Sequence, residues 1–459
     1  MSKYMGTTLV RSFSAFVVAV AATGVGLPAS AQSRAANPKN VIVMIADGWS
    51  RNTITAARYH RGAPAVYDRA TWAQAYMSTY PGSTSSKPGL PAEDQKGSYD
   101  TTLFWSSFDY AKQKATDSAA AATTMASGIK TYNSAIGMDM LGNPVELATE
   151  SAKKAGKSAG VITTVPLSHA TPAGFATHSL GRGSYAEIAR SMLKESRLDV
   201  IMGAGHPEFD DNHEPAQKSA QYVGGDELWA ELKSGKLEGA DADGDGKPDP
   251  WTFVETKSDF MALRYWRAPK RVCGVLQVNS TAQQGRAAGR PRNDLPTLAD
   301  MSLGAINVLS SNPKGFFLMV EGGAVDWASH GNQRDRVIEE QQDFDAAVEA
   351  VSRWVEANSS WKETLVVVTG DHETGYLWGP GSGVVDGKPV WNEIRDTGPG
   401  NLPGMQYNST GHTNSLIPLF ARGAGASQLM ALATKKDLRR GRYLDNADLG
   451  RFLVEVARR

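Results

Sequence analysis

The sequence of 459 residues contains a single cysteine, and neither sign of charge prevails in it. Lys plus Arg and Asp plus Glu each number 48. This balance argues against a nucleic-acid-binding protein, and the lack of long single-sign runs argues against an anchor to anionic membranes. One cysteine cannot form an internal disulfide, so stability must come from the core and from any bound metal. Cys273 stands in an apolar, strand-like run, which predicts a buried structural thiol.

Long apolar runs are lacking as well, apart from one near the beginning of the sequence. Two cations precede the apolar stretch 13–27, and the small residues 29–31 form an A-x-A cleavage site. The stretch is shorter than the ~20 residues that a membrane-spanning helix needs. The pattern predicts a secretory signal peptide over residues 1–31. We therefore expect residues 32–459 to be exported, periplasmic or extracellular, with no membrane span after cleavage.

The chain does contain a regular alternation of short apolar runs with helical stretches. The apolar runs predict strands, and runs that are apolar nearly throughout are typical of a parallel sheet covered on both faces. The predicted strands are residues 40–46, 158–165, 198–202, 316–320, 364–369 and 417–421. The longest helical stretch, 334–356, carries an apolar stripe at three- to four-residue spacing. The sequence thus predicts an α/β three-layer sandwich with a large, mostly parallel central sheet flanked by helices.

Two regions interrupt this alternation. Residues 81–100 are rich in Gly, Ser and Pro, which predicts a surface loop. Residues 205–266 are polar, and we interpret them as an insertion or cap region within a catalytic domain that spans residues 32–459.

The polar region carries a run of aspartates that resembles an EF-type calcium loop. Its D-x-D-x-D-G pattern comprises Asp241, Asp243 and Asp245, with Asp249 at the ninth position, but the twelfth position is Thr252 where a Glu is expected. A structural Ca²⁺ site and a solvated acidic turn both stay open. A non-catalytic calcium-dependent binding module is the alternative from another functional class, and it leaves the features below unexplained.

Metal-competent side chains directly follow several predicted strands. Asp47, Glu321, Asp371 and His372 each come after an apolar run. In open parallel α/β sheets, ligands bind at the carboxyl ends of the strands. Each residue alone is typical of a turn or a surface, but together they favour a metal site at one edge of the sheet.

Asp326 and His330 add a further pair, because residues four apart share a face of a helix. Such a pair is often only a solvated face. Carboxylates together with histidines suit Zn²⁺, and additional oxygen-only ligands suit Mg²⁺.

Ser118 begins an Ala-rich run with strong helix propensity. A serine at a helix start is usually an N-cap, but the positive end of a helix also suits an anion. No G-x-S-x-G elbow surrounds Ser118, which argues against an α/β-hydrolase, so another activator such as a metal is needed. Arg182 offers a planar fork that matches phosphate or sulfate. Together these parts describe a two-metal phosphoryl-transfer site.

With these residues, the sequence resembles the alkaline phosphatase family from about residue 40 to about residue 423. Six motifs occur in the order and spacing of the family. They are Val-Ile-Val-Met-Ile-Ala-Asp47-Gly, Thr116-Asp117-Ser118-Ala-Ala, His169-Ala-Thr171-Pro, Val-Glu321-Gly-Gly-Ala-Val-Asp326-Trp327-Ala-Ser-His330, Thr-Gly-Asp371-His372-Glu-Thr-Gly and Gly411-His412-Thr413.

The resemblance implies a role for each matching residue. Ser118 matches the phosphorylated nucleophile, Arg182 the phosphate-binding arginine, and Asp117 the carboxylate that orients it. The implied cofactors are two Zn²⁺ and one Mg²⁺. Their implied ligands are Asp326, His330 and His412 for the first zinc, Asp47, Asp371 and His372 for the second, and Asp47, Thr171 and Glu321 for magnesium.

The implied activity is the hydrolysis of small-molecule phosphate monoesters at alkaline pH, through a phosphoserine that zinc-bound water then hydrolyses. Members of the family are often dimeric, so a homodimer is among the expectations. A phosphodiesterase or sulfatase on the same fold is the nearest alternative. Arg182, Thr171 and Glu321 favour a monoester, and the chain has no formylglycine-type motif of a sulfatase.

The chain departs from the enterobacterial enzymes at two positions. It has His169 where they have an acidic residue, and Trp327 where they have a lysine. A histidine near the third metal shifts the expected preference from Mg²⁺ toward Zn²⁺. Loss of the lysine predicts weaker binding of the phosphate product.

Overall fold

The structure is a computed structural model, and it describes residues 37–265 and 267–459. The predicted signal peptide lies outside these residues. None of the helices in the described part combines the length and the apolar character that crossing a membrane requires.

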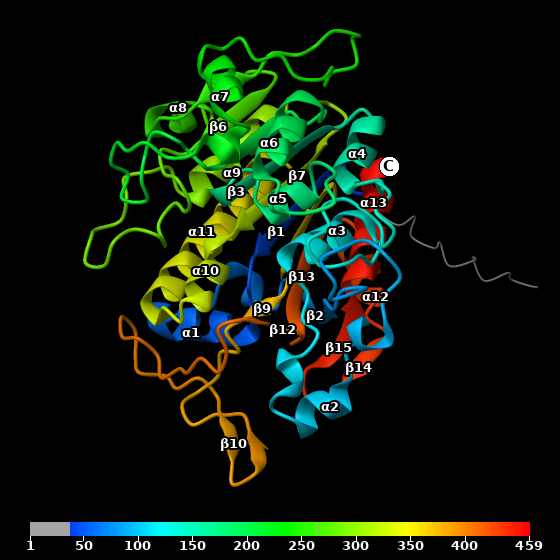
Figure 1. Cartoon of the computed structure of the whole chain (residues 1–459), viewed down its shortest axis with the longest axis vertical. Helices are drawn as coiled ribbons and strands as arrows, with labels where there is room; N and C mark the ends of the chain where they lie inside the picture. Colours follow the sequence, from blue (N-terminus) through cyan, green and yellow to red (C-terminus); the bar gives the residue numbers. More distant parts are fainter. Residues whose placement is uncertain (1–36, 266) are drawn as a thin grey trace, which may run out of the picture. The chain divides into compact units, whose positions relative to one another are not determined.

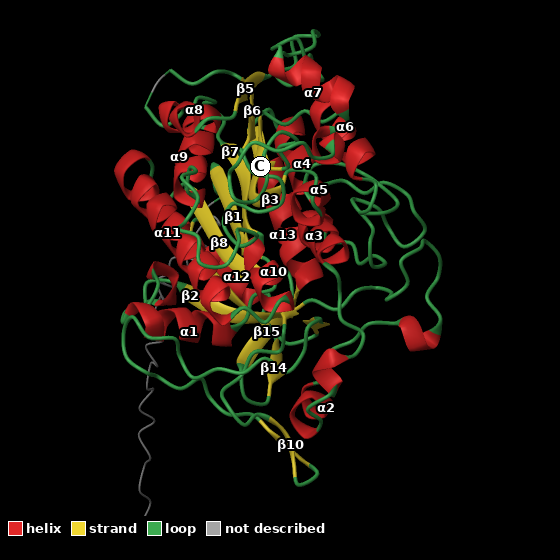
Figure 2. Cartoon of the chain, turned by 60° about the vertical axis from the view of Figure 1, so that its left-hand side comes forward, coloured by secondary structure: helices red, strands yellow, loops and turns green. Residues whose placement is uncertain are grey.

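The strands form one large sheet and two small ones (Figures 1 and 2). The strands of the large sheet are β1 (Asn40–Ala46), β2 (Ala73–Ser78), β3 (Ser158–Pro166), β4 (Val200–Ala204), β5 (Thr252–Val254), β6 (Val272–Val275), β7 (Phe316–Gly322), β8 (Thr364–Gly370), β13 (Ile417–Gly423), β14 (Lys435–Asp437) and β15 (Gly441–Asp445). The small sheets pair β9 (Glu373–Thr374) with β12 (His412–Thr413) and β10 (Gly383–Val385) with β11 (Lys388–Val390).

The eleven strands of the large sheet follow the order β14-β15-β2-β13-β8-β1-β7-β3-β4-β6-β5. From β8 to β5 all neighbours are parallel, whereas β13 is antiparallel to both of its neighbours and β14 to β15. All six predicted runs are strands of this sheet, and the expected mostly parallel sheet is confirmed.

Helices connect these strands. They are α1 (Arg51–Arg61), α2 (Thr101–Ser106), α3 (Ser118–Ser127), α4 (Ala148–Lys154), α5 (Ala170–Gly174), α6 (Tyr185–Lys194), α7 (Asp226–Lys233), α8 (Lys257–Ala262), α9 (Leu298–Leu309), α10 (Ala324–His330), α11 (Arg334–Asn358), α12 (Ala426–Ala431) and α13 (Asn446–Arg458). Short 3₁₀ turns are η1 (Val66–Asp68), η2 (Glu93–Gln95), η3 (Tyr110–Lys112) and η4 (Ala220–Val223). The predicted helix over 334–356 is α11.

Helices cover both faces of the sheet, as Figure 2 shows. Side chains of β1 alternate between two apolar cores, because successive residues of a strand point to opposite faces. Val41 and Val43 belong to a core shared with α3, α4, α6 and α13, and Ile42 and Met44 to a core shared with α1, α9 and α11. The three-layer sandwich is thereby confirmed.

The segment 205–266, expected as an insertion or cap, contributes to the sandwich itself. Its strand β5 pairs with β6 at the end of the sheet, and Leu228 and Leu232 of α7 pack into the same core as α3.

In the expected surface loop 81–100, the short 3₁₀ turn η2 is the only helical element. Cys273 lies on β6, fully buried, and burial raises the pKa of its thiol to about 12, so the expected structural thiol is confirmed.

Helices α3 and α13 approach each other closely at a glycine. A Cβ added at Gly450 on α13 would lie 2.2 Å from the carbonyl oxygen of Thr124 and 2.4 Å from the backbone nitrogen of Gly128. No side chain fits between these backbones. The position of α3, whose first residue is Ser118, therefore depends on this glycine.

We expect Gly450→Ala to lower the free energy of unfolding by about 1–3 kcal/mol, because the added methyl group overpacks the contact between the helices. Thermal unfolding followed by circular dichroism measures the change. Glu455→Ala, at an exposed position of the same helix, is the control and should leave the midpoint nearly unchanged. An unchanged midpoint of thermal unfolding in Gly450→Ala would show that the two helices can move apart without a loss of stability.

Candidate active site

The carboxyl ends of three neighbouring strands bring the predicted acidic residues together. In the sheet, β1 lies between β7 and β8, and Ala46 is level with both Gly322 and Gly370. Asp47 and Asp371 follow directly after their strands, and Glu321 is the residue before the last one of β7, level with Ile45 of β1. Residues that are far apart in the sequence thus meet at one edge, as expected.

A glycine next to Asp47 makes this close approach possible. Gly48 has φ of +72°, and a Cβ there would lie 2.6 Å from the Cα of Asp326. Its backbone N–H donates a hydrogen bond to Asp371 Oδ1 at 3.1 Å. Only glycine adopts this conformation without strain and leaves this space free. The turn therefore places Asp47 beside both Asp326 and Asp371.

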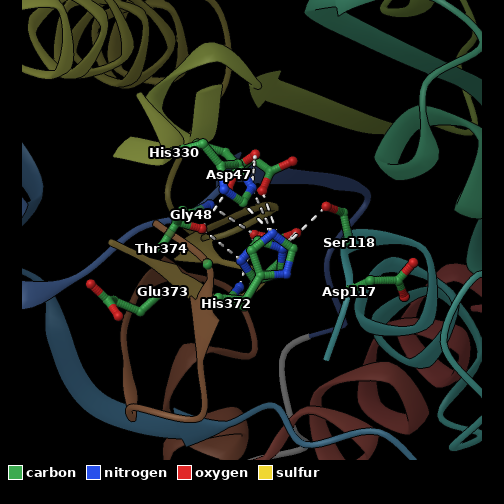
Figure 3. Close-up of polar contacts among 12 residues, drawn as sticks. Asp47, Gly48, Asp117, Ser118, His330, His372, Glu373 and Thr374 are labelled. Carbon is green, nitrogen blue, oxygen red and sulfur yellow. Dashed lines mark hydrogen bonds and ion pairs between the residues drawn. The ribbon is translucent and has the colours of Figure 1, made fainter. Parts of the chain in front are cut away.

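Asp47, Asp371 and His372 form a fully buried group. His372 Nε2 lies 3.4 Å from Asp47 Oδ1 and 3.1 Å from Asp371 Oδ2. Ser118 Oγ lies 3.1 Å from the same imidazole nitrogen, and Figure 3 shows it pointing toward the group.

Asp326, His330 and His412 form a second group beside the first. Asp326 Oδ2 lies 3.4 Å from His330 Nε2, and Asp326 Oδ1 lies 3.6 Å from His412 Nε2. The two histidine nitrogens are 3.0 Å apart. The rings of His412 and His372 stack with centroids 3.7 Å apart, so the two groups adjoin. Potential ligand atoms of Asp326, His372 and His412 also lie within 4.8 Å of one another.

The acidic residues of the site are buried without enough hydrogen-bond donors. Both carboxylate oxygens of Asp47, Oδ2 of Asp371 and Oε1 of Glu321 have no hydrogen-bond partner among the described residues. The hydroxyl of Thr171 is buried and equally unpartnered. Buried charges of one sign are costly unless they are paired or coordinate a metal. This set of oxygen and nitrogen donors fits metal cations.

The pKa shifts have the same physical origin. Burial, with a smaller contribution from Asp326, raises the pKa of Asp371 to about 8. Burial raises the pKa of Glu321 to about 7 and, together with repulsion from Asp371, raises that of Asp47 well above its ordinary value. Burial and the neighbouring His412 hold the pKa of His372 well below its ordinary value. The histidine is thus neutral, which is the form that binds metals.

Asp117 connects Ser118 to Arg182. Its side chain accepts a hydrogen bond from the backbone N–H of Ala120 at 2.9 Å, so Asp117 is the N-cap of α3 and Ser118 is the first helical residue. The other oxygen of Asp117 lies 3.1 Å from Arg182 Nη1. One carboxylate therefore fixes both the start of the helix and the guanidinium.

His169 lies next to Arg182, with its Nε2 3.3 Å from Arg182 Nη2. Burial, with a smaller contribution from Arg182, lowers the pKa of His169 to about 3, so the ring is neutral. Its Nδ1 is buried and has no hydrogen-bond partner in the described part of the chain. The ring of Trp327 contacts it edge-on at 5.6 Å.

Two residues that the sequence analysis gave no role hold the expected ligands in place. Thr374 Oγ1 donates to Asp326 Oδ1 at 2.5 Å and lies 3.3 Å from His372 Nδ1. Glu373 accepts a hydrogen bond from the hydroxyl of Thr413, next to His412 in the β9–β12 pair. Both lie in the recognised Glu-Thr-Gly motif, but a sequence pattern does not show which hydroxyl meets which carboxylate.

The aspartate run forms a separate group away from these strand ends. Ligand atoms of Asp241, Asp243 and Asp249 lie within 4.8 Å of one another, and Asp245 is not part of that set. These carboxylates already accept backbone N–H groups of the loop, and Asp243 pairs with Lys270 at 2.9 Å. A Ca²⁺ site here stays a prediction.

The sheet, together with the buried carboxylates and histidines at its carboxyl edge, defines an α/β enzyme of the metal-dependent class. A model of the alkaline phosphatase family matches residues 38–397. The chain belongs to the alkaline phosphatase family.

Individual relatives agree with this membership. The chain is 32% identical to alkaline phosphatase 4 of Bacillus subtilis over 343 residues, 73% of this chain and 62% of that protein. It is 30% identical to alkaline phosphatase of Escherichia coli over 433 residues, 87% of this chain and 84% of that one. The matches cover about six tenths of the length of the two Bacillus subtilis relatives, alkaline phosphatases 4 and 3.

Solved structures show the same fold. The alkaline phosphatase of the Antarctic bacterium TAB5 superposes with a TM-score of 0.62 at 25% identity, covering 92% of this chain and 99% of that one. The Thermus thermophilus alkaline phosphatase gives a TM-score of 0.63 at 21% identity, covering 94% and 95% of the two chains.

We expect Thr374→Val to weaken metal retention or activity about 10- to 100-fold, because residues that orient metal ligands typically contribute that much. Thr374→Ser keeps the hydroxyl and should retain both. Metal content after dialysis against graded chelator concentrations measures the effect. Equal metal content in both variants and the wild type would contradict the role of the Thr374 hydroxyl.

We also expect the metal-free protein to lose stability as the pH rises from about 7 to about 8.5. Asp371 and Asp47 have raised pKa values in the folded state, so the folded protein binds more protons than the unfolded chain in this window. Histidines are mostly neutral in both states there. Calorimetry of chelated and metal-loaded protein checks this. The metal-loaded protein should show no such decline in stability. An equal decline with pH in the chelated and the loaded protein would contradict the explanation.

Proposed function

We propose that the protein hydrolyses phosphate monoesters through a phosphoserine at Ser118. The observation that carries this proposal is the pair of adjoining groups of carboxylates and histidines. The first group is fully buried, has unpartnered carboxylate oxygens and contacts the Ser118 hydroxyl through His372. Membership of the alkaline phosphatase family supports it.

The proposed metals are two Zn²⁺ and a third ion, with the ligands that the resemblance implies. Asp326, His330 and His412 would hold the first zinc, and Asp47, Asp371 and His372 the second. Asp47, Thr171 and Glu321 would hold the third ion. A TAB5 alkaline phosphatase variant with a histidine changed to aspartate has magnesium in its M3 site. Because this chain has the neutral His169 near its third site, we propose that the third ion is Mg²⁺ or Zn²⁺.

The residues of the chain perform the reaction in two displacements. When bound, the metals supply Lewis acidity that lowers the pKa of the attacking hydroxyl and of water and stabilises the leaving alkoxide. Ser118 Oγ attacks phosphorus, the bond to the ester oxygen breaks, and the alcohol leaves. Water then attacks the phosphoserine, which releases phosphate and restores Ser118.

Arg182 and α3 hold the transferred group. The guanidinium fork matches two non-bridging phosphate oxygens, and Asp117 keeps it aimed. The N-terminus of α3 adds backbone N–H groups and a positive partial charge beside Ser118. Both features favour the dianionic monoester over a monoanionic diester.

We further propose that residues 1–31 are removed and that the remainder is exported to a periplasm or beyond. A homodimer stays an expectation of the family resemblance.

Ser118→Ala should reduce kcat for p-nitrophenyl phosphate at alkaline pH by about 10³-fold or more, because the covalent route is lost. Metal content should stay near the wild-type level, since Asp47, Asp371 and His372, the proposed ligands of the zinc that would also hold the Ser118 oxygen, are kept. Ser310→Ala, at the exposed end of α9, is the control and should keep full activity. Undiminished turnover in Ser118→Ala would overturn the mechanism.

Chelation should abolish turnover of the monoester, and zinc with magnesium should restore it, because the buried carboxylates need cations to act. Rates for matched aryl monoester, diester and sulfate substrates should be compared on the reloaded enzyme. A higher kcat/KM for the diester or the sulfate than for the monoester would contradict phosphomonoesterase activity. It would support the alternative, a phosphodiesterase or sulfatase of the same fold.

A further inference from the structure

Four aromatic rings form a row that passes Arg182. The rings of Trp327 and His169 have centroids 5.6 Å apart, and His169 stacks on Tyr185 at 6.4 Å with an interplanar angle of 12°. Tyr185 in turn meets Tyr222 edge-on at 5.0 Å. The row therefore leads from the neighbour of Asp326 outward past the phosphate-binding arginine.

This row is held at its middle by Arg182 and at its outer ring by Ser168. His169 Nε2 lies 3.3 Å from Arg182 Nη2, and Tyr185 follows Arg182 by three residues, at the start of α6. Burial alone would lower the pKa of Arg182, but Asp117 and, less strongly, Asp47 and Tyr185 raise it above its ordinary value. At the other end, the carbonyl of Tyr222 accepts a hydrogen bond from Ser168 at 3.0 Å.

Apart from the buried His169, the rings of this row lie outside the apolar interior of the described protein. Trp327, Tyr185 and Tyr222 are half-buried, and none belongs to the apolar clusters of the described residues. The Tyr185 hydroxyl and the Trp327 indole N–H have no hydrogen-bond partner within the described ranges. A Cβ added at Gly183, between Arg182 and Tyr185, would meet nothing within 4 Å. Large rings outside the core, beside open space and a catalytic arginine, are suited to contact a ligand.

We propose that Tyr185 and Tyr222 form a stacking surface for the leaving group, so that the enzyme favours monoesters with a planar ring close to the phosphate, as in nucleotides and aryl phosphates. Every nucleobase and aryl ring has a face that stacks on tyrosine, so this surface selects a class of leaving group and no single base. The inference rests on the proposed phosphomonoesterase activity. Arg182 would hold the phosphate while the ring of the same molecule lies against Tyr185.

The test compares AMP with ribose 5-phosphate on the metal-loaded enzyme. Both release the same type of 5′-hydroxyl, so the difference between their kcat/KM values isolates the contact with the ring. The wild type should favour AMP by about five- to 150-fold, the range that stacking of one base on an aromatic side chain provides. Tyr185→Leu and Tyr222→Leu should each bring the ratio toward one, mainly through a higher KM for AMP, and leave ribose 5-phosphate nearly unaffected.

Matched variants separate the ring from other effects. Tyr185→Phe keeps the ring and should keep the preference. Tyr265→Leu, at an exposed tyrosine beyond α8, should change neither substrate. A wild-type ratio near one, or a ratio that both leucine variants leave unchanged, would overturn the stacking surface. Failure of the wild type to hydrolyse either substrate would instead overturn the proposed function.

Discussion

The structure depends on one electrostatic constraint, the burial of Asp47, Glu321, Asp326 and Asp371 in a single region. Four carboxyl groups in a low-dielectric interior repel one another, and the described protein atoms leave several of their oxygens without a donor. Such a cluster is stable only when it is protonated or bound to cations. The neutral His372 beside it and the Arg182 guanidinium, already shared with Asp117, leave most of that charge to metal ions.

The sheet satisfies this constraint through its strand order. Because β1 lies between β7 and β8, the carboxyl ends of strands from distant parts of the chain meet at one edge of the sheet. The sequence predicted these strands well, since runs such as 40–46 and 364–369 are buried on both faces and therefore apolar throughout. It also predicted the residues that follow them. It did not predict β14 and β5, which are only three residues long and lie at the margins of the sheet, where partial exposure leaves no continuous apolar run.

Contacts among side chains were the second kind of feature that could not be predicted from the sequence. A serine at the start of an Ala-rich helix suggests an N-cap, yet Asp117 takes that position and Ser118 is the first helical residue. The bond from Thr374 to Asp326, like the ring row beyond His169, joins segments that only the tertiary fold brings together. Local patterns contain the types of residues needed for the chemistry, but the supporting hydrogen bonds depend on distances that no local pattern encodes.

The central position of β1 also has a consequence for the order of assembly. Its two partner strands lie far along the chain, and such long-range pairing forms slowly because a large loop must close first. The group of Asp47, Asp371 and His372 does not exist until β1 and β8 have joined, since Asp47 follows β1 and the other two residues follow β8. Loading of this proposed metal site therefore follows the pairing of β1 with β8, and a chain truncated before β8 lacks two of its three proposed ligands.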